Sequence, residues 1–278
     1  RNVMTLLAPG FKLSASYLVE ALDQYIPRLI IGLFLGPTMV GYYSIAVRFW
    51  MVTRDVFLLP LTTVFFPALA KEKHGELHDN SYLVRDLVYL TALLTLPPLF
   101  GLAALSPSLI PLVFGEMWQV AGKLTAVYLI GCVLLPFLVI ARTLCRVENK
   151  LGYFVLLQVI QLCINSLVIF MLMPWGIFAA VVGGVVVNIA WGILFIAMIE
   201  RAAEFPLSIH LQRCALIFAS CFTMYGMLLS IDHWIPVGVA EINRVLVIFC
   251  VGFSIMLTML VAQGAFRNDS VRALFKPK

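Results

Sequence analysis

Residues 11–36 read FKLSASYLVEALDQYIPRLIIGLFLG, and residues 41–70 read GYYSIAVRFWMVTRDVFLLPLTTVFFPALA. Each stretch is long enough to cross a bilayer as one helix, because about 20 apolar residues span the hydrocarbon core. Both stretches nevertheless contain charges. A charge at the centre of a spanning helix costs about 2.5–3.5 kcal/mol, so six that faced lipid would cost about 15–20 kcal/mol. We therefore expect the following side chains to face one another, the span ends or a wet cavity: Glu20, Asp23, Arg28, Arg48, Arg54 and Asp55.

The rest of the chain has the composition of a membrane protein. Of its 278 residues, 62% are hydrophobic and only 12% are charged, which is about half the charged fraction of soluble domains. This pattern predicts an all-α integral membrane protein with about eight transmembrane helices. Residues 1–200 are expected to form a six-helix lobe, and residues 201–278 two additional peripheral helices with a basic cytoplasmic tail. The apolar runs are 11–35, 41–68, 83–105, 119–145, 151–173, 176–200, 210–231 and 243–266.

Basic residues are distributed unequally between the two ends of these runs. The loops expected on one side contain no Lys or Arg; they are 36–41, 106–118, 174–176 and 231–242, of which 106–118 is expected to be a short external hairpin. By the positive-inside rule the opposite side is cytoplasmic, so both termini are expected inside the cell. The net charge of +5 then indicates contact with anionic lipid headgroups and not with nucleic acid. The basic side contains Arg1, Lys12, Lys71, Lys73, Arg85, Arg142, Arg146, Lys150, Arg201, Arg213, Arg267, Arg272, Lys276 and Lys278.

Two arginines in the first two runs fall at matching depth. Gly36 and Gly41 bracket the outer turn, and at 1.5 Å per residue Arg28 and Arg48 lie about 10–12 Å below it. If the helices are antiparallel neighbours, the two guanidinium groups form an upper rung. They offer planar, bidentate donors to phosphate or carboxylate. Alternatively, they bond to nearby acids and backbone carbonyls, or snorkel toward the outer surface.

A lower rung mixes acids and bases. Asp23, Arg54 and Asp55 lie about 20 Å below the outer turn on the same scale. Glu20, Gln24 and Arg28 are spaced at i, i+4 and i+8, so they are expected to form one stripe of the first helix, with Asp23 beside it. These acids are expected to be structural or electrostatic partners of the arginines, although they are also candidates for contact with a substrate.

Two later runs add polar candidates. Lys123, just inside the outer end of the fourth run, is a candidate for guarding the mouth of a cavity, and snorkelling is the alternative. Gln158, Gln161 and Asn165 form a stripe that either faces the lumen or bonds across helices; the sequence does not decide between the two.

Motifs of enzymes and metal sites are lacking. The chain contains no HExxH, no GxSxG and no Rossmann fingerprint. His74 and His78 are a lone pair without a clear third ligand. The six cysteines lie in apolar runs or near their ends, which predicts small packing residues and not disulfides. We expect no catalytic residue, no cofactor and no bound metal.

Three motifs resemble those of a known family. They are GLFLGPTMVGYYSIAVRF (32–49), VFFPALAKE (64–72) and PLVFGEMWQVAGKL (111–124). In this order they resemble the polysaccharide-export, Wzx-type flippases of the multidrug/oligosaccharidyl-lipid/polysaccharide (MOP) superfamily. The spacing is similar to that of the second half of these fourteen-span proteins. The resemblance implies that the chain comprises spans seven to fourteen, and that its partners include a missing N-terminal lobe of the same protein.

The resemblance also implies a function. Such proteins flip undecaprenyl-diphosphate-linked oligosaccharide across the bacterial cytoplasmic (inner) membrane for O-antigen or exopolysaccharide synthesis. They are thought to work by alternating access, without ATP. An amphiphile of this kind needs a cation-lined cavity for its head and a lipid-open side for its tail. The candidate substrate-binding residues are Arg28, Arg48, Glu20, Gln24, Asp23, Arg54, Asp55 and Lys123.

Three other functions compete with this one. A cation or drug antiporter on the same fold would favour carboxylates over a pair of arginines. A membrane-embedded glycan polymerase or ligase usually has a large external loop with catalytic residues, whereas the outer loops here are short and contain no Lys or Arg. A structural subunit without cargo would not need six buried charges.

Overall fold

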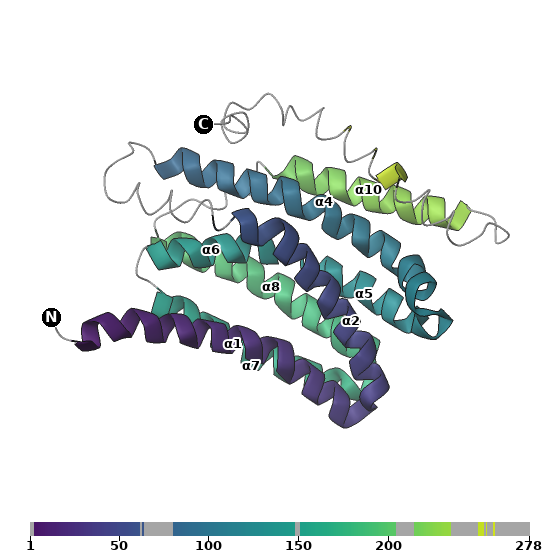
Figure 1. Ribbon diagram of the computed structural model, residues 1–278, viewed down its shortest axis with the longest axis horizontal. Helices are drawn as coiled ribbons and strands as arrows, with labels where there is room; N and C mark the ends of the chain where they lie inside the picture. The colour runs from purple at the N-terminus through teal and green to yellow at the C-terminus, as the bar shows by residue number, and fades with distance from the viewer. Residues whose placement is uncertain are drawn as a thin grey trace.

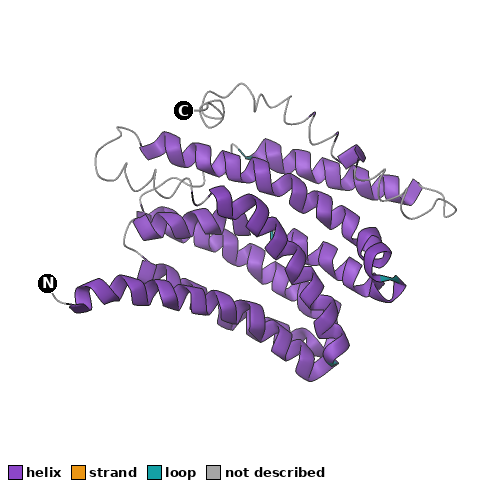
Figure 2. Ribbon diagram, in the orientation of Figure 1, coloured by secondary structure: helices purple, strands orange, loops and turns teal. Residues whose placement is uncertain are grey.

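The computed structural model describes residues 3–61, 63, 80–147, 151–203, 214–234, 250–252, 254 and 258. Every regular element in this part is a helix (Figure 2), which confirms the all-α prediction. The α-helices are α1 (Val3–Leu35), α2 (Pro37–Thr53), α4 (Asn80–Phe114), α5 (Gln119–Gly131), α6 (Leu135–Val147), α7 (Leu151–Leu172), α8 (Ile177–Ala203) and α10 (Ala215–Trp234). The short elements are the π-helix η1 (Arg54–Leu58) and the 3₁₀-helices η2 (Glu116–Trp118) and η3 (Met173–Trp175).

The helices pack in three groups (Figure 1). Helix α1 lies along α7 on one side of the bundle, and α4 lies along α10 on the other. Helices α5, α6 and α8 fill the space between them, and α2 packs against both α1 and α5. The largest apolar core joins α4, α5, α6 and α10 around Phe100 and Phe137, and a second core joins α1, α2, α5, α7 and α8 around Ile31 and Leu124.

Three glycines make the turns at one end of the bundle. Gly36, Gly115 and Gly176 have φ of 81°, 97° and 95°, a conformation that glycine adopts without the steric cost of a Cβ atom. A new helix begins after each of them. Gly36 therefore forms the turn that the sequence predicted, but α2 begins at Pro37, so Gly41 lies inside the helix and does not bracket the turn.

The expected hairpin over 106–118 is wrong for most of its length. Helix α4 continues through Pro107 and Pro111 to Phe114, so only Gly115 and η2 form the connection. Pro107 cannot bond to the carbonyl of Ala103, but the Ser106 hydroxyl donates to that oxygen at 3.1 Å. Hydroxyl side chains commonly satisfy carbonyls that proline frees inside membrane helices.

Three of the described helices are long and apolar enough to cross a membrane: Val88–Phe114, Gly152–Trp175 and Ile177–Ala197. A fourth span is possible if the pair Glu116–Gly131 and Leu135–Thr143, bent by 44°, counts as one. Helix α1 is long enough, but it contains charges that lower its hydropathy. The total of eight spans remains a prediction, and most of the expected last run, 243–266, lies outside the described residues.

Candidate functional site

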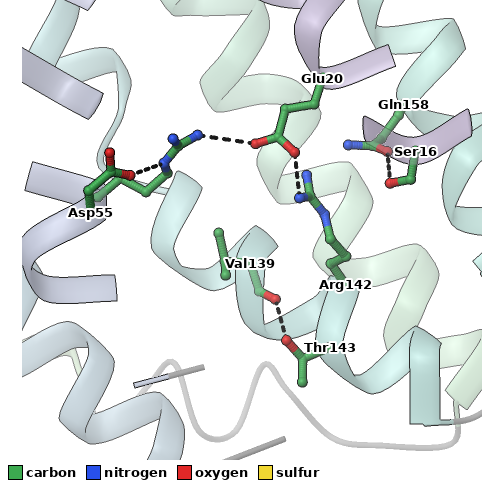
Figure 3. Close-up of polar contacts among 8 residues, drawn as sticks. Ser16, Glu20, Asp55, Val139, Arg142, Thr143 and Gln158 are labelled. Atoms are coloured by element: carbon green, nitrogen blue, oxygen red, sulfur yellow. Dashed lines mark hydrogen bonds and ion pairs between the residues drawn. The ribbon is translucent and has the colours of Figure 1, made fainter. Parts of the chain in front are cut away.

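Glu20 on α1 is the centre of an ion cluster, which we define as Glu20, Arg54, Asp55 and Arg142. The Oε1 atom of Glu20 accepts from Nη1 of Arg54 at 3.2 Å, and its Oε2 atom accepts from Nη1 of Arg142 at 2.7 Å (Figure 3). Nε of Arg54 donates to Oδ1 of Asp55 at 2.9 Å. One carboxylate therefore connects α1 to both η1 and α6.

The core of the ion cluster is partly shielded from solvent. The side chains of Glu20, Arg54 and Arg142 are 27%, 21% and 17% exposed, whereas Asp55 is 50% exposed. The Arg142 guanidinium also lies 5.4 Å from the centre of the Phe154 ring. A guanidinium over an aromatic face gains roughly 0.5–2 kcal/mol, more as it is desolvated. Arg142 is therefore held by both a carboxylate and a ring.

The ion cluster borders a cavity of about 120 Å³ between α1, α2, α5, α6, α7 and α8. Gln161 Nε2 donates to Asn188 Oδ1 at 3.2 Å across the α7–α8 contact, and Ser16 Oγ donates to Gln158 Oε1 at 3.1 Å across the α1–α7 contact. Other lining residues include Asp23, Gln24, Trp50, Tyr128, Phe154 and Phe195. A charged, polar cavity inside an apolar helix bundle indicates a functional site.

The charges around this cavity balance. Four of its lining residues carry a formal charge, two acids and two bases: Glu20, Asp23, Arg54 and Arg142. Asp23 Oδ1 and Arg142 Nε are buried and have no hydrogen-bond partner among the described residues. The cavity therefore contains donors and acceptors that remain available, but no excess of positive charge while Glu20 stays in place.

Comparison with known proteins supports the resemblance. Residues 1–123 match the family described as "Polysaccharide biosynthesis protein". Over 117 residues the chain is 37% identical to teichuronic acid biosynthesis protein TuaB of Bacillus subtilis, and over 112 residues it is 30% identical to lipopolysaccharide biosynthesis protein WzxC of Escherichia coli. The resemblance to polysaccharide-export proteins is confirmed. Each match covers 40% of this chain, and 23% and 22% of TuaB and WzxC respectively.

One further relative and one solved structure are also similar to this chain. Succinoglycan biosynthesis transport protein ExoT of Rhizobium meliloti is 28% identical over 121 residues, which are 44% of this chain and 24% of ExoT. The lipid II flippase MurJ, in an inward closed conformation, superposes with a TM-score of 0.63 at 17% identity. That match covers 93% of this chain and 53% of MurJ, so the two proteins share a fold over nearly all 278 residues.

The structure brings together most of the residues of the predicted lower rung. Glu20, Asp23, Gln24 and Arg54 all line the cavity. Asp55 does not line it, but its carboxylate accepts from Arg54. Glu20 and Gln24 therefore point into the cavity together, as their spacing predicted, but Arg28, the third residue of the predicted stripe, does not line this cavity.

The two arginines of the upper rung lie elsewhere. Arg28 lines a shallow groove between α1 and the start of α2, with its guanidinium 5.5 Å from the centre of the Tyr25 ring. Arg48 is exposed and lines neither this groove nor the cavity. The expectation that both face one cavity is not met in this conformation. The reason is that the neighbouring Val47 turns into the cavity, and successive helical residues point about 100° apart.

Lys123 is exposed near the start of α5, and it lines neither the cavity nor the Arg28 groove. It therefore lies on the surface and not at the mouth of the cavity in this conformation.

Sequence reasoning missed Arg142, which it assigned to a cytoplasmic loop. The residue lies inside α6 and binds Glu20, and the apolar residues on both sides of it were the signal that it is within a helix. Both predicted alternatives hold for two residues of the polar stripe on α7. Gln158 and Gln161 line the cavity, and each also forms a hydrogen bond to a neighbouring helix. Asn188 on α8, for which no hydrogen bond was predicted from the sequence, accepts from Gln161.

Among the described residues, no three His, Cys, Asp or Glu side chains are grouped so as to hold a metal ion. His74 and His78 lie outside the described residues.

Proposed function

We propose that this chain is part of a membrane transporter that flips undecaprenyl-diphosphate-linked oligosaccharide from the cytoplasmic to the periplasmic leaflet. The observation that carries this proposal is a charged cavity between apolar helices in a chain whose relatives are named for polysaccharide synthesis and transport. A polar headgroup on a lipid tail needs both features in order to cross a bilayer. The role is transport by alternating access and not catalysis.

Arg28 and Arg48 are proposed to contact the diphosphate during this movement. Both lie on the α1–α2 hairpin, and neither forms an ion pair with a residue that the structure describes. Unpaired guanidinium groups in a membrane bundle are costly unless a ligand, water or lipid headgroup meets them. Phosphate oxygens match the two-pronged donor geometry of arginine. The other candidate residues are proposed to lie along the path of the substrate; they are Glu20, Asp23, Gln24, Arg54, Asp55 and Lys123.

The architecture and location of the transporter are part of the proposal. Residues 1–200 form one transmembrane lobe, and residues 201–278 add two peripheral helices and a cytoplasmic tail. The packing of α10 on α4, the outer side of the bundle in Figure 1, supports this division. A second lobe of the same protein completes the path for the substrate, in keeping with the 53% of MurJ that the chain covers. The transporter lies in the bacterial cytoplasmic membrane with both termini inside.

The test is complementation of a strain that lacks its own flippase, with the gene that encodes this chain. Arg28→Ala and Arg48→Ala should each abolish polymer export while membrane abundance stays at the wild-type level. Glu116→Gln, at an exposed position outside the candidate set, should export normally. If both alanine variants export at the wild-type level, the arginines do not bind the substrate. If they fail only because the protein is degraded, the arginines are structural.

The same strain separates transport from the competing functions. A missing flippase leaves lipid-linked repeat units in the cytoplasmic leaflet, whereas a missing polymerase or ligase leaves them in the periplasmic leaflet. A missing cation antiporter changes drug sensitivity and leaves polymer export intact. Accumulation in the periplasmic leaflet, or normal export with altered drug sensitivity, would overturn the proposal.

A further inference from the structure

The ion cluster has the geometry of an occupied anion site. Two guanidinium groups from different elements, η1 and α6, converge on one carboxylate, and each donates to a different oxygen. Charge-assisted bonds of this kind form equally with carboxylate and with phosphate. Glu20 therefore occupies the position that an anionic ligand between Arg54 and Arg142 would take.

The size of the cavity limits what that ligand is. The cavity volume of about 120 Å³ is well below the roughly 300–1,000 Å³ of pockets that bind drug-sized ligands. This space admits a phosphate group beside the arginines, but not an oligosaccharide. The amides of Gln24, Gln158 and Gln161 also line it, and they supply N–H donors for the remaining phosphate oxygens.

We infer that Arg54 and Arg142 form a phosphate-binding subsite which Glu20 occupies when no substrate is present, and that the diphosphate of the lipid substrate displaces this carboxylate. The inference rests on the proposed function, and it adds a second phosphate site about 24 Å from the outer turn, since Glu20 is sixteen residues before Gly36 at 1.5 Å per residue.

Displacement of Glu20 also explains how binding is coupled to movement. Glu20 is the described contact that joins α1 to both η1 and α6 through ion pairs. When phosphate takes its place, the two arginines keep their charge partner but α1 is released from them. Helix α1 can then separate from η1 and α6 by breaking only its packing contacts with them, because the ion pairs no longer hold it.

The balance of charges makes the subsite selective. With Glu20 and Asp23 present, the cavity has no net formal charge, so a weakly bound anion gains little by entering. A diphosphate gains more, because it brings two phosphate groups and several acceptor oxygens. Glu20 therefore acts as a competitor, and its removal should strengthen anion binding instead of weakening it.

The experiment measures whether the loss of Glu20 strengthens or weakens diphosphate binding, with the purified full chain in a non-ionic detergent. The ligand is farnesyl diphosphate, a short prenyl diphosphate, and binding is followed by isothermal titration calorimetry. Glu20→Gln should lower the Kd at least about fivefold, and Asp23→Asn should lower it less. Arg142→Gln and Arg54→Gln should each raise the Kd at least about tenfold. Glu116→Gln, an exposed acid at the opposite end of the bundle, is the matched control and should leave the Kd unchanged.

Two further ligands separate the sources of the phosphate. Inorganic pyrophosphate tests the headgroup alone, and farnesol tests the tail alone. Weaker binding of pyrophosphate that still tightens in Glu20→Gln supports the subsite, and farnesol binding should not respond to this substitution.

Two results would overturn the inferred subsite, and one variant has a substitute if it does not fold. If Glu20→Gln weakens or does not change diphosphate binding while its thermal midpoint stays near the wild-type value, the inferred subsite is wrong. If Arg142→Gln does not fold, the inference is tested by the other two variants: the Kd should fall in Glu20→Gln and rise in Arg54→Gln. If the wild-type chain binds neither farnesyl diphosphate nor pyrophosphate, and Glu20→Gln binds neither, the subsite fails; the proposed function fails only if complementation fails as well.

Discussion

The two ends of the α1–α2 hairpin hold their arginines differently. At the end away from Gly36, Arg54 and Arg142 share the carboxylate of Glu20. At the Gly36 end, Arg28 lies over an aromatic ring and Arg48 is exposed, and neither has an ion pair among the described residues. A paired charge stabilises the contact between helices, whereas an unpaired one in an apolar bundle is a cost that a ligand, lipid headgroup or water must offset. The comparison separates arginines whose guanidinium groups are already paired with a carboxylate from arginines that have no such partner among the described residues.

The largest expected contrast is in thiol labelling, because the two ends of the bundle are predicted to face opposite sides of the membrane. With Cys163 and Cys250, the two exposed cysteines of the described residues, replaced by Ser, single cysteines are introduced in intact cells. Met117→Cys and Trp175→Cys, both 73% exposed at present, should react with an impermeant thiol reagent, because positive-inside topology puts these turns outside. His74→Cys should react only after the cells are permeabilised. The reverse pattern would show that the orientation is inverted.

The next contrast concerns stability. Arg142→Ala should lower the free energy of unfolding by about 2 kcal/mol, less than the 3–5 kcal/mol of a fully buried pair because its side chains are partly exposed. In a chain of this size that corresponds to a fall of about 4–8 °C in Tm. Arg48→Ala should leave Tm within about 1 °C, because an exposed side chain without such a partner contributes little. Thermal unfolding in detergent checks both.

A Tm for Arg48→Ala that falls as far as that of Arg142→Ala would remove the distinction between the two ends. It would assign Arg48 to the fold and not to the substrate.

A smaller contrast tests geometry at the unpaired end. Arg48→Lys keeps the charge but loses the planar fork that binds phosphate in a bidentate manner. Polymer export should therefore fall several-fold without being abolished. Export equal to that of the wild type would show that charge alone matters at this position, and export as low as that of Arg48→Ala would show that the fork is essential.

The smallest contrast is expected at Asp55. This side chain is 50% exposed and bonds to an arginine that Glu20 already holds. Exposed ion pairs contribute about 0–1 kcal/mol, so Asp55→Asn should lower Tm by no more than about 2–4 °C. A larger loss than that caused by Arg142→Ala would move the centre of the ion cluster from Glu20 to Arg54.

The sequence predicted that Glu20 and Gln24 share a face, but it did not predict the separate position of Arg28 or the directions of the side chains in η1. The four-residue spacing of Glu20 and Gln24 holds because α1 is a regular helix throughout that region. In α2 the π-helix η1 begins at Arg54, and each residue of a π-helix advances by a smaller angle than in an α-helix. Arg54 therefore turns toward Glu20 while Asp55 remains half exposed, a result that a helical wheel does not give.

Arg142 shows why the site as a whole could not be read from the sequence. Its partner Glu20 is 122 residues away, and the contact depends on the 44° bend between the α5 and α6 segments. Local sequence patterns predict which residues are buried and which face of a helix they share, but they do not predict which distant helix packs against that face. Composition and charge asymmetry thus predicted the membrane fold and the polar hairpin, and the tertiary structure supplied the second arginine.

The most direct test of the account is the location of the lipid-linked oligosaccharide in cells with and without the gene that encodes this chain. Right-side-out membrane vesicles are treated with an impermeant reagent that oxidises exposed sugars, and the modified fraction of the undecaprenyl-diphosphate-linked repeat unit is measured. The account predicts that most of the repeat unit is modified when the gene is present, and that it is protected when the gene is deleted or encodes Arg48→Ala. An equal modified fraction in all three strains would contradict it.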